Sequence, residues 1–123
     1  MILVRMNWKS NFAKGKELVL STSSRKGIPN ANVVLSLGII DNKLLVANCQ
    51  MNTTLKNLKE NNNICVIGGY FRIKGTVEIF SSDKYFDLCI KNNKEYSVSN
   101  AILITVNEVF DLNKCSLVNI RSN

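Results

Sequence analysis

The residues best suited to chemistry lie in the segment ANCQMNTTLKNLKEN, residues 47–61. The pattern predicts a strand, then a polar loop, then a short helix that begins near Thr53. A helix start presents unpaired backbone N–H groups at the positive end of the helix dipole, and together these bind anions. Thr53 and Thr54 add hydroxyl groups there, and Gln50 and Asn52 add amides. The segment could therefore hold a phosphate monoester, although an ordinary cap by Asn52 or Thr53 shows the same pattern.

The chain contains no histidine. This absence removes Ser-His-Asp and Cys-His catalysis as usually built, and it removes the commonest nitrogen ligand of transition metals. We therefore nominate no catalytic acid or base and no metal ligand. Any chemistry must come from a bound cofactor.

Length and composition indicate one domain, expected to span residues 1–123, with 46% hydrophobic residues and a real core. No apolar run approaches the roughly 18 residues of a membrane-spanning helix, and the first twelve residues do not read as a signal peptide. The four cysteines lie in apolar surroundings and match no zinc spacing: Cys49, Cys65, Cys89 and Cys115. We expect them to be reduced and packed as small hydrophobes, which favours a cytoplasmic location.

The order of apolar runs and turn signals predicts a mainly β protein, with six antiparallel strands and two or three short helices. The strands are expected at residues 17–22, 31–40, 43–47, 64–68, 71–79 and 101–106, the last extending to about residue 110. Asp41-Asn42 predicts a tight hairpin turn, and Gly75 predicts a bulge. Leu55 and Leu58 mark the apolar side of the first helix.

A second helix is expected after Asp83, whose carboxylate suits a helix start. Its apolar side is expected to hold Tyr85, Phe86, Cys89 and Ile90. Trp8, Tyr70 and Phe71 are interpreted as packing or interface residues. Strands in hairpin succession, without the usual nucleotide-binding glycine loops, favour an antiparallel barrel over a parallel nucleotide-binding sheet.

The net charge of +7 comes from sixteen basic residues that are spread along the chain. Scattered lysines usually form a solvated surface, with a mild preference for anionic ligands. A small basic β-barrel that binds nucleic acid remains an alternative function. The low aromatic content of 7% argues against it, because such proteins stack bases on exposed rings.

Four features in order resemble the FMN-binding split barrels of the pyridoxamine 5′-phosphate oxidase-like superfamily. They are the strand ELVLSTSS with its G-x-P turn, the hairpin ANVVLSLGIIDNKLLVA, the loop CQMNTTLKNLKENN, and the strand FRIKGTVEIF followed by a helix. The resemblance covers roughly residues 16–106. It implies a six-stranded antiparallel split barrel that binds FMN and serves as an FMN-dependent oxidoreductase or electron carrier.

The resemblance also implies which residues hold the flavin. The phosphate and ribityl chain would be held by Gln50, Met51, Asn52, Thr53 and Thr54. The isoalloxazine ring would lie along a strand that contributes Asn32, Val33 and Val34, with Ser36 as a further candidate. Lys74 is interpreted either as a nearby positive charge or as a solvated strand lysine.

Members of this class are typically homodimers with the flavin at the subunit interface, so a second subunit and a small-molecule or electron-transfer partner are expected. The chain departs from full pyridoxamine phosphate oxidases, because Asn32 and Asn52 stand where those enzymes carry basic residues. Neutral donors bind phosphate more weakly than charged ones, and the substrate-gripping Arg and His residues have no histidine counterpart here. A deazaflavin or haem in place of FMN also remains open.

Overall fold

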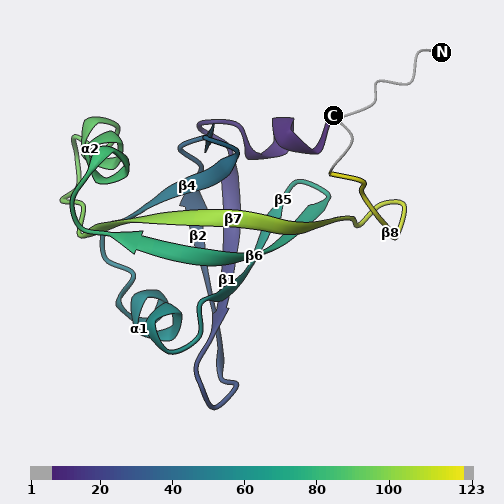
Figure 1. The fold of residues 1–123 in the computed structure, drawn as a ribbon, viewed down its shortest axis with the longest axis horizontal. Helices are drawn as coiled ribbons and strands as arrows, with labels where there is room; N and C mark the ends of the chain where they lie inside the picture. The colour runs from purple at the N-terminus through teal and green to yellow at the C-terminus, as the bar shows by residue number, and fades with distance from the viewer. Residues whose placement is uncertain (1–6, 121–123) are drawn as a thin grey trace.

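The computed structural model describes residues 7–120, which form one antiparallel eight-stranded sheet with two α-helices and a short 3-10 helix (Figure 1). The strands are β1 (Glu17–Ser23), β2 (Pro29–Leu35), β3 (Ile39–Ile40), β4 (Lys43–Asn48), β5 (Asn63–Gly68), β6 (Phe71–Phe80), β7 (Asn100–Asp111) and β8 (Ser116–Leu117). The helices are η1 (Trp8–Phe12), α1 (Asn52–Glu60) and α2 (Lys84–Lys91). The strand order β2-β1-β5-β6-β7-β4-β3 leaves the sheet open, with β8 added to β7.

The described residues therefore form a split barrel, as predicted, with eight strands in place of six. One extra strand is the two-residue β8. The other arises because the predicted strand over residues 31–40 is divided into β2 and β3. The chain turns at Gly38, whose φ of +100° is accessible to glycine and costly for most other residues.

The residues between β2 and β3 close one end of the barrel. Ser36 exchanges backbone hydrogen bonds with the start of β1, through Lys16 O (2.8 Å) and the Gly15 N–H (2.9 Å). The next residue, Leu37, donates its N–H to Leu45 O on β4 at 2.9 Å, and the Leu45 N–H returns to Gly38 O at 3.0 Å. We call residues 36–38 the bridge. Beyond the bridge β2 and β4 are not paired, and the barrel is split there.

Alternating residues of β4 and β7 divide between two cores. Leu44 and Val46 of β4 lie inside the barrel with Ile102 and Ile104 of β7. Leu45 points the other way and packs with Cys89 of α2. This alternation is what a strand covered on both faces requires. The position of α2 is thus fixed by a small core of its own outside the barrel (Figure 1).

Several local predictions are confirmed. The hairpin turn forms at Asp41 and Asn42, which both have positive φ, and Ile40 pairs with Lys43. The ladder between β6 and β7 shifts its register between Lys74 and Gly75, which is the predicted bulge. A Cβ on Gly75 would lie 2.2 Å from Thr105 O, so the close approach of the two backbones requires glycine.

Other predictions need correction. Ile90 is 47% exposed and does not belong to the buried side of α2, where Cys89 is fully buried. Cys115 is exposed at a positive-φ position, whereas the other three cysteines are buried or half-buried and all four are free. Trp8 packs against the barrel core, edge-on to Phe12 with the ring centroids 6.0 Å apart, so its packing role is confirmed.

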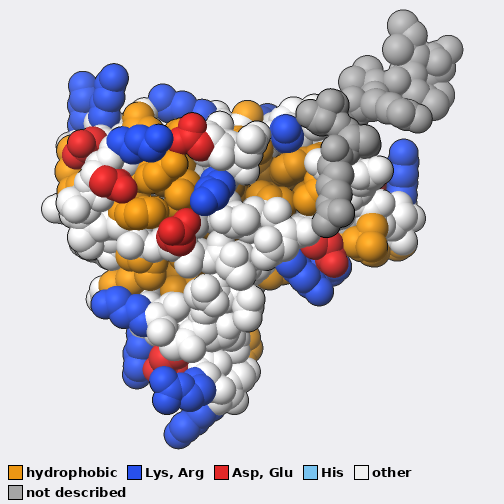
Figure 2. Space-filling model, viewed as in Figure 1, with side chains coloured by type: hydrophobic (Ala, Val, Ile, Leu, Met, Phe, Trp, Pro, Cys, Tyr) orange, Lys and Arg blue, Asp and Glu red, His pale blue; other side chains and the backbone are white. Residues whose placement is uncertain are grey.

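Basic side chains are dispersed over the face in Figure 2, with a group at the tip of the β1–β2 turn, where Arg25 and Lys26 are exposed. Among the described residues, no helix is long and apolar enough to cross a membrane. Nor do the described residues gather three or more potential metal-ligating side chains at any point.

Candidate functional site

The start of α1 lacks a side-chain cap. The cap position falls on Met51, and neither Asn52 nor Thr53 caps the helix, which corrects the sequence prediction. The Met51 N–H donates to Asn48 Oδ1 at 2.7 Å, and the Asn52 N–H donates to Gln50 O at 3.0 Å. Within residues 7–120, no hydrogen bond satisfies the next two N–H groups, those of Thr53 and Thr54. Two backbone donors at the positive end of α1 are therefore free.

The Thr54 side chain is committed to the fold. It is 1% exposed, and its hydroxyl donates to Asn32 Oδ1 on β2 while accepting from Asn30 Nδ2 at 3.3 Å. Asn30 Nδ2 also donates to Asn32 Oδ1 at 3.0 Å. These bonds tie the first turn of α1 to β2 across the split. Thr53, in contrast, is exposed and its hydroxyl makes no hydrogen bond within the described residues.

A second buried contact holds the same helix to β1. Asn57 is 4% exposed and donates from Nδ2 to Thr22 Oγ1 at 3.1 Å. The buried face of this helix contains Leu58, as predicted, and also two polar residues, Thr54 and Asn57. Sequence reasoning missed Asn30, Asn57 and Thr22. The three-residue spacing of Thr54 and Asn57, which places them on one helix face, is the signal that could have indicated them.

A cavity of about 430 Å³ occupies the split between β2 and the loop that leads to α1. Its lining residues come from four places: Lys14 and Gly15 before β1, residues 33–37, residues 47 and 49–51, and Asn92, Asn93 and Tyr96 after α2. The structure thus brings five of the nine predicted flavin contacts to one cavity, namely Val33, Val34, Ser36, Gln50 and Met51. The volume falls within the roughly 300–1,000 Å³ of small-molecule sites.

The strand wall of this cavity is apolar and partly open. Val33 is 68% exposed, whereas Val34 also packs against the barrel core. Ser36 lines the cavity, but its hydroxyl donates to Phe12 O at 2.7 Å and accepts from the Gly38 N–H at 2.9 Å. The Ser36 hydroxyl is therefore fully used in stabilising the bridge. Asn32 lies on the same strand, where it bonds Thr54.

The charge of the cavity is sparse. Lys14 is the one charged side chain among its described lining residues. Burial raises the pKa of the Cys49 thiol, which also lines the cavity, so this thiol stays neutral near pH 7. Burial likewise raises the pKa of Cys89, on the buried side of α2, to about 12, with proximity to Cys49 as a second cause. Lys74 lies elsewhere, at another groove.

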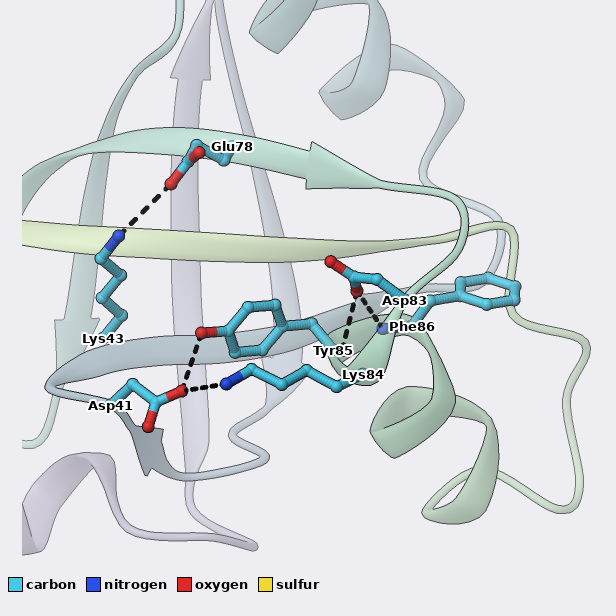
Figure 3. Close-up of polar contacts among 7 residues, drawn as sticks. All are labelled: Asp41, Lys43, Glu78, Asp83, Lys84, Tyr85 and Phe86. Carbon is cyan, nitrogen blue, oxygen red and sulfur yellow. Dashed lines mark hydrogen bonds and ion pairs between the residues drawn. The ribbon is translucent and has the colours of Figure 1, made fainter.

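The outer wall of the cavity depends on α2, because Asn92, Asn93 and Tyr96 follow it in the chain. Figure 3 shows how α2 is held. Asp41, in the β3–β4 turn, accepts from Lys84 Nζ at 2.9 Å and from the Tyr85 hydroxyl at 2.8 Å. These two hydrogen bonds lower the pKa of Asp41, and the bond from Lys84 has the larger effect. The hydrogen bond to Asp41 also raises the pKa of Tyr85.

The helix start of α2 is capped, unlike that of α1. Asp83 Oδ1 accepts from the Tyr85 N–H at 2.9 Å and from the Phe86 N–H at 3.4 Å (Figure 3). A second ion pair in the same view joins Lys43 to Glu78 across the sheet at 3.3 Å. Of these two ion pairs, only that of Asp41 and Lys84 contacts α2, and neither pair contributes a residue to the lining of the cavity.

Together the fold and the cavity define a class: a small split-barrel protein that offers a cavity in the split beside an uncapped helix start. The family model of pyridoxamine 5′-phosphate oxidase matches residues 8–113, which is most of the chain. The chain belongs to the pyridoxamine 5′-phosphate oxidase family.

Three further likenesses agree with this assignment. An uncharacterized protein of Methanocaldococcus jannaschii is 25% identical over 105 residues, which cover 76% of this chain and 70% of that protein. The crystal structure of HupZ from Group A Streptococcus has a TM-score of 0.79 at 18% identity, and the match covers 95% of this chain and all of that one. An FMN-binding protein from Syntrophomonas wolfei has a TM-score of 0.67 at 18% identity, covering 82% and 78%. At these identities, the two structural likenesses show the fold.

Proposed function

We propose that this protein binds FMN in the split and acts as an FMN-dependent oxidoreductase or electron carrier. The observation that carries the proposal is the cavity of about 430 Å³ whose lining includes both the exposed Val33 and Met51, the cap position of α1. A flavin needs an apolar surface for its ring, which Val33 and Val34 offer in the cavity wall. Its phosphate needs hydrogen-bond donors. Gln50 offers one in the lining, and the N–H groups of Thr53 and Thr54 follow closely after the lining residue Met51. The predicted contacts that are not lining residues themselves are Asn32, Asn52, Thr53 and Thr54. The structural relative from Syntrophomonas wolfei, an FMN-binding protein of the same fold, supports it.

The residues present fit the phosphate of such a cofactor. The free N–H groups of Thr53 and Thr54, the Thr53 hydroxyl and the exposed Gln50 amide are neutral donors at the positive end of α1. A phosphate is well suited to this position. Thr54 would contribute its N–H alone, because its hydroxyl proton is donated to Asn32. Its side chain is thus a positioning group that holds the loop against β2.

Each wall of the cavity then has a task. Val33 and Val34 would lie along the ring, and the backbone of Ser36 would close the far end beside Lys14. Tyr96 and the two asparagines after α2 would limit the access of solvent. Bound FMN would supply hydride or electron transfer, which the side chains here do not provide. The four free cysteines support a reducing, cytoplasmic setting.

We further propose a homodimer with the flavin at the subunit interface. One row of residues crosses the outer face of the sheet in register: Val33, Val19, Ile67, Arg72, Phe110 and Leu117. Val33 (68%), Ile67 (37%) and Leu117 (65%) of this row are exposed. Five of the six residues in this row are apolar, Arg72 being the exception, and exposed apolar side chains gathered on one face are typical of an interaction site. Because Val33 belongs both to the row and to the cavity wall, a partner on the row would cover the flavin.

The cofactor is tested by the absorbance spectrum of the protein as purified, followed by mass identification of any released chromophore. The expected result is a yellow protein that releases FMN, or a colourless protein that takes up FMN with a shifted visible spectrum. A released deazaflavin or haem would reassign the cofactor while keeping the cavity. Protein that ignores excess FMN would overturn the proposal.

The phosphate position is tested with Thr53→Val, with Thr53→Ser as the matched control that keeps the hydroxyl. Loss of one hydrogen bond to a charged group should weaken FMN binding about tenfold in Thr53→Val. The control should bind as the parent does. Equal affinity of all three proteins, measured by quenching of flavin fluorescence, would place the phosphate elsewhere.

The dimer is tested by light scattering after size-exclusion chromatography. Ile67→Lys places a charge in the middle of the row and should yield monomers. Ile28→Lys is the control, because Ile28 is 64% exposed and lies outside the row, before β2. A parent protein that is monomeric at all concentrations would refute the dimer and leave the FMN proposal standing.

A further inference from the structure

A second cavity, of about 410 Å³, lies outside the split and shares no lining residue with it. It is a groove formed by the end of β1, the segment after α1, the start of β5, and the middle of β6 and β7. Seven of its ten lining residues are polar or charged: Ser21, Thr22, Ser23, Asn61, Asn63, Lys74 and Asn107, with Ile64, Cys65 and Gly75 as the others. We call it the polar groove.

Strand register places the central side chains of the groove in one line. Ser21 pairs with Cys65, and Cys65 pairs with Lys74, so the three project from the same face of adjacent strands. The next strand, β7, carries the bulge here, because Lys74 pairs with Glu108 and Gly75 pairs with Val106. The residue between them, Asn107, is left without a partner in the ladder and reaches the groove.

The bulge is a built feature of this surface. Gly75 allows the β6 backbone to approach Thr105 O so closely that a Cβ would lie 2.2 Å away. Bulges of this kind redirect a side chain, and they are frequent beside binding sites. At the other end of the groove, Asn61 is held in place because its Oδ1 accepts from the Asn63 N–H at 3.2 Å and from Asn63 Nδ2 at 3.0 Å. The Asn61 amide nitrogen is left available.

Donors dominate the groove. Within residues 7–120, the side chains of Ser21, Lys74 and Asn107 make no hydrogen bond or ion pair. No described acidic residue lines the groove. Glu108 stands opposite Lys74 in the ladder, yet the two form no ion pair. Burial raises the pKa of the Cys65 thiol, and the nearby charges of Arg72 and Lys74 oppose that rise.

We propose that the polar groove binds a small phosphorylated sugar or polyol. The Lys74 ammonium group and the amides of Asn107 and Asn61 suit the phosphate, because a lysine with amide donors forms charge-assisted hydrogen bonds. The volume of about 410 Å³ leaves room for more than a phosphate alone. The hydroxyl of Ser21 and the amide of Asn63 match the hydroxyl groups of a polyol. This site goes beyond the flavin function and does not rest on it.

The test uses glucose 6-phosphate as the probe, titrated into the full chain in the presence of excess FMN and followed through backbone amide resonances. Chemical-shift changes are expected at Ser21, Lys74 and Asn107. Glucose and inorganic phosphate should each bind more weakly than the combined molecule. Changes confined to Thr53 and Thr54 would show that the phosphate enters the split, and a lack of any change would likewise overturn the proposal.

Three variants sharpen the result. Lys74→Gln should weaken binding about tenfold, as expected for the loss of a charge-assisted hydrogen bond. Glu108→Gln removes a carboxylate beside Lys74 and should tighten binding. Lys91→Gln removes the same charge from the end of α2, the helix that packs on the core outside the barrel. This variant should leave the affinity unchanged. If Lys74→Gln and Lys91→Gln weaken binding equally, the attraction comes from net charge and the groove is not the site. The affinities of these three variants for glucose 6-phosphate test the groove even if the protein binds no flavin.

Discussion

The two short helices of this protein begin in opposite ways. Helix α2 is capped by the carboxylate of Asp83, which satisfies two backbone N–H groups and places a negative charge at the positive helix end. Helix α1 begins at an apolar residue, Met51, without a side-chain cap, and the N–H groups of Thr53 and Thr54 are free within the described residues. A cap and a ligand compete for the same donors. The start of α2 is therefore closed by its own side chain, whereas the start of α1 leaves donors open for the phosphate that we propose.

The largest effect is expected when the start of α1 is given a negative charge like the one at the start of α2. Asn52→Asp keeps the side-chain shape and places a carboxylate in the first turn of α1. Repulsion of the phosphate should weaken FMN binding by at least about tenfold, since two charges near a protein surface interact by several kcal/mol at 4 Å. The helix itself should become more stable by about 0.3–1 kcal/mol.

The control for this variant is Asn62→Asp, which adds the same charge just beyond the other end of α1. Flavin fluorescence titration and chemical denaturation check the two effects. Asn52→Asp should bind FMN more weakly and unfold less readily than the parent, and Asn62→Asp should not show this combination. A variant that binds FMN as the parent does would contradict the phosphate position.

A second prediction separates the two threonines of α1. Thr54→Val removes the buried hydroxyl that donates to the half-buried amide of Asn32, so the free energy of unfolding should fall by about 1–3 kcal/mol. Thr53→Val, at an exposed position, should change it by less than about 0.5 kcal/mol. Urea denaturation measures both. Equal losses would show that Thr54 does not hold α1 to β2.

A third prediction concerns the capped helix. Asp83→Ala removes the acceptor of the Tyr85 and Phe86 N–H groups and should lower the free energy of unfolding by about 1 kcal/mol. Ser82→Ala, one residue earlier and equally exposed, is the control and should have little effect. FMN affinity should stay unchanged in both. A loss of affinity in Asp83→Ala would show that α2 takes part in binding.

The smallest expected effect is the pH dependence of the Asp41 contact. Hydrogen bonds from Lys84 and Tyr85 lower the pKa of Asp41 below its usual 3.8 in the folded state. The stabilisation is therefore complete above the unfolded pKa and is lost as pH falls through the lower, folded pKa. Asp41→Asn tolerates the positive φ of this turn position.

Comparison of unfolding free energies at pH 6 and pH 3 checks this point. The difference between parent and Asp41→Asn should shrink at the lower pH, and added salt should reduce it at pH 6 because the pair is exposed. A difference that stays constant across this range would show that the carboxylate contributes nothing.

Features decided by local chemistry could be predicted from the sequence. The Asp41-Asn42 turn, the Gly75 bulge and the Asp83 helix start each depend on residues within a few positions. The start of α1 could not be predicted in the same way. Asn52 and Thr53 are good capping residues, yet the contact between Thr54 and Asn32, 22 positions away, sets where the helix begins to pack. The same holds for Asn57, which is buried by its bond to Thr22.

The candidate site shows the same division. The sequence nominates residues 50–54 of the loop and residues 32–34 and 36 of the strand, and the structure brings five of these nine residues to one cavity. The hydrogen-bond partners of these side chains could not be predicted from the sequence. The Ser36 hydroxyl donates to Phe12 O, and the Thr54 hydroxyl donates to Asn32 Oδ1. Lys14 and the segment after α2 lie far from the loop in sequence and gave no signal.

The bridge at residues 36–38 has a mechanical consequence. Four backbone hydrogen bonds fasten this end of β2 to β1 and β4, while farther along the split β2 faces the cavity. Any widening of the split must therefore use these three residues as its hinge. If this hinge exists, the amides of Ser36, Leu37 and Leu45 should exchange hydrogen slowly even where the loop before α1 exchanges freely.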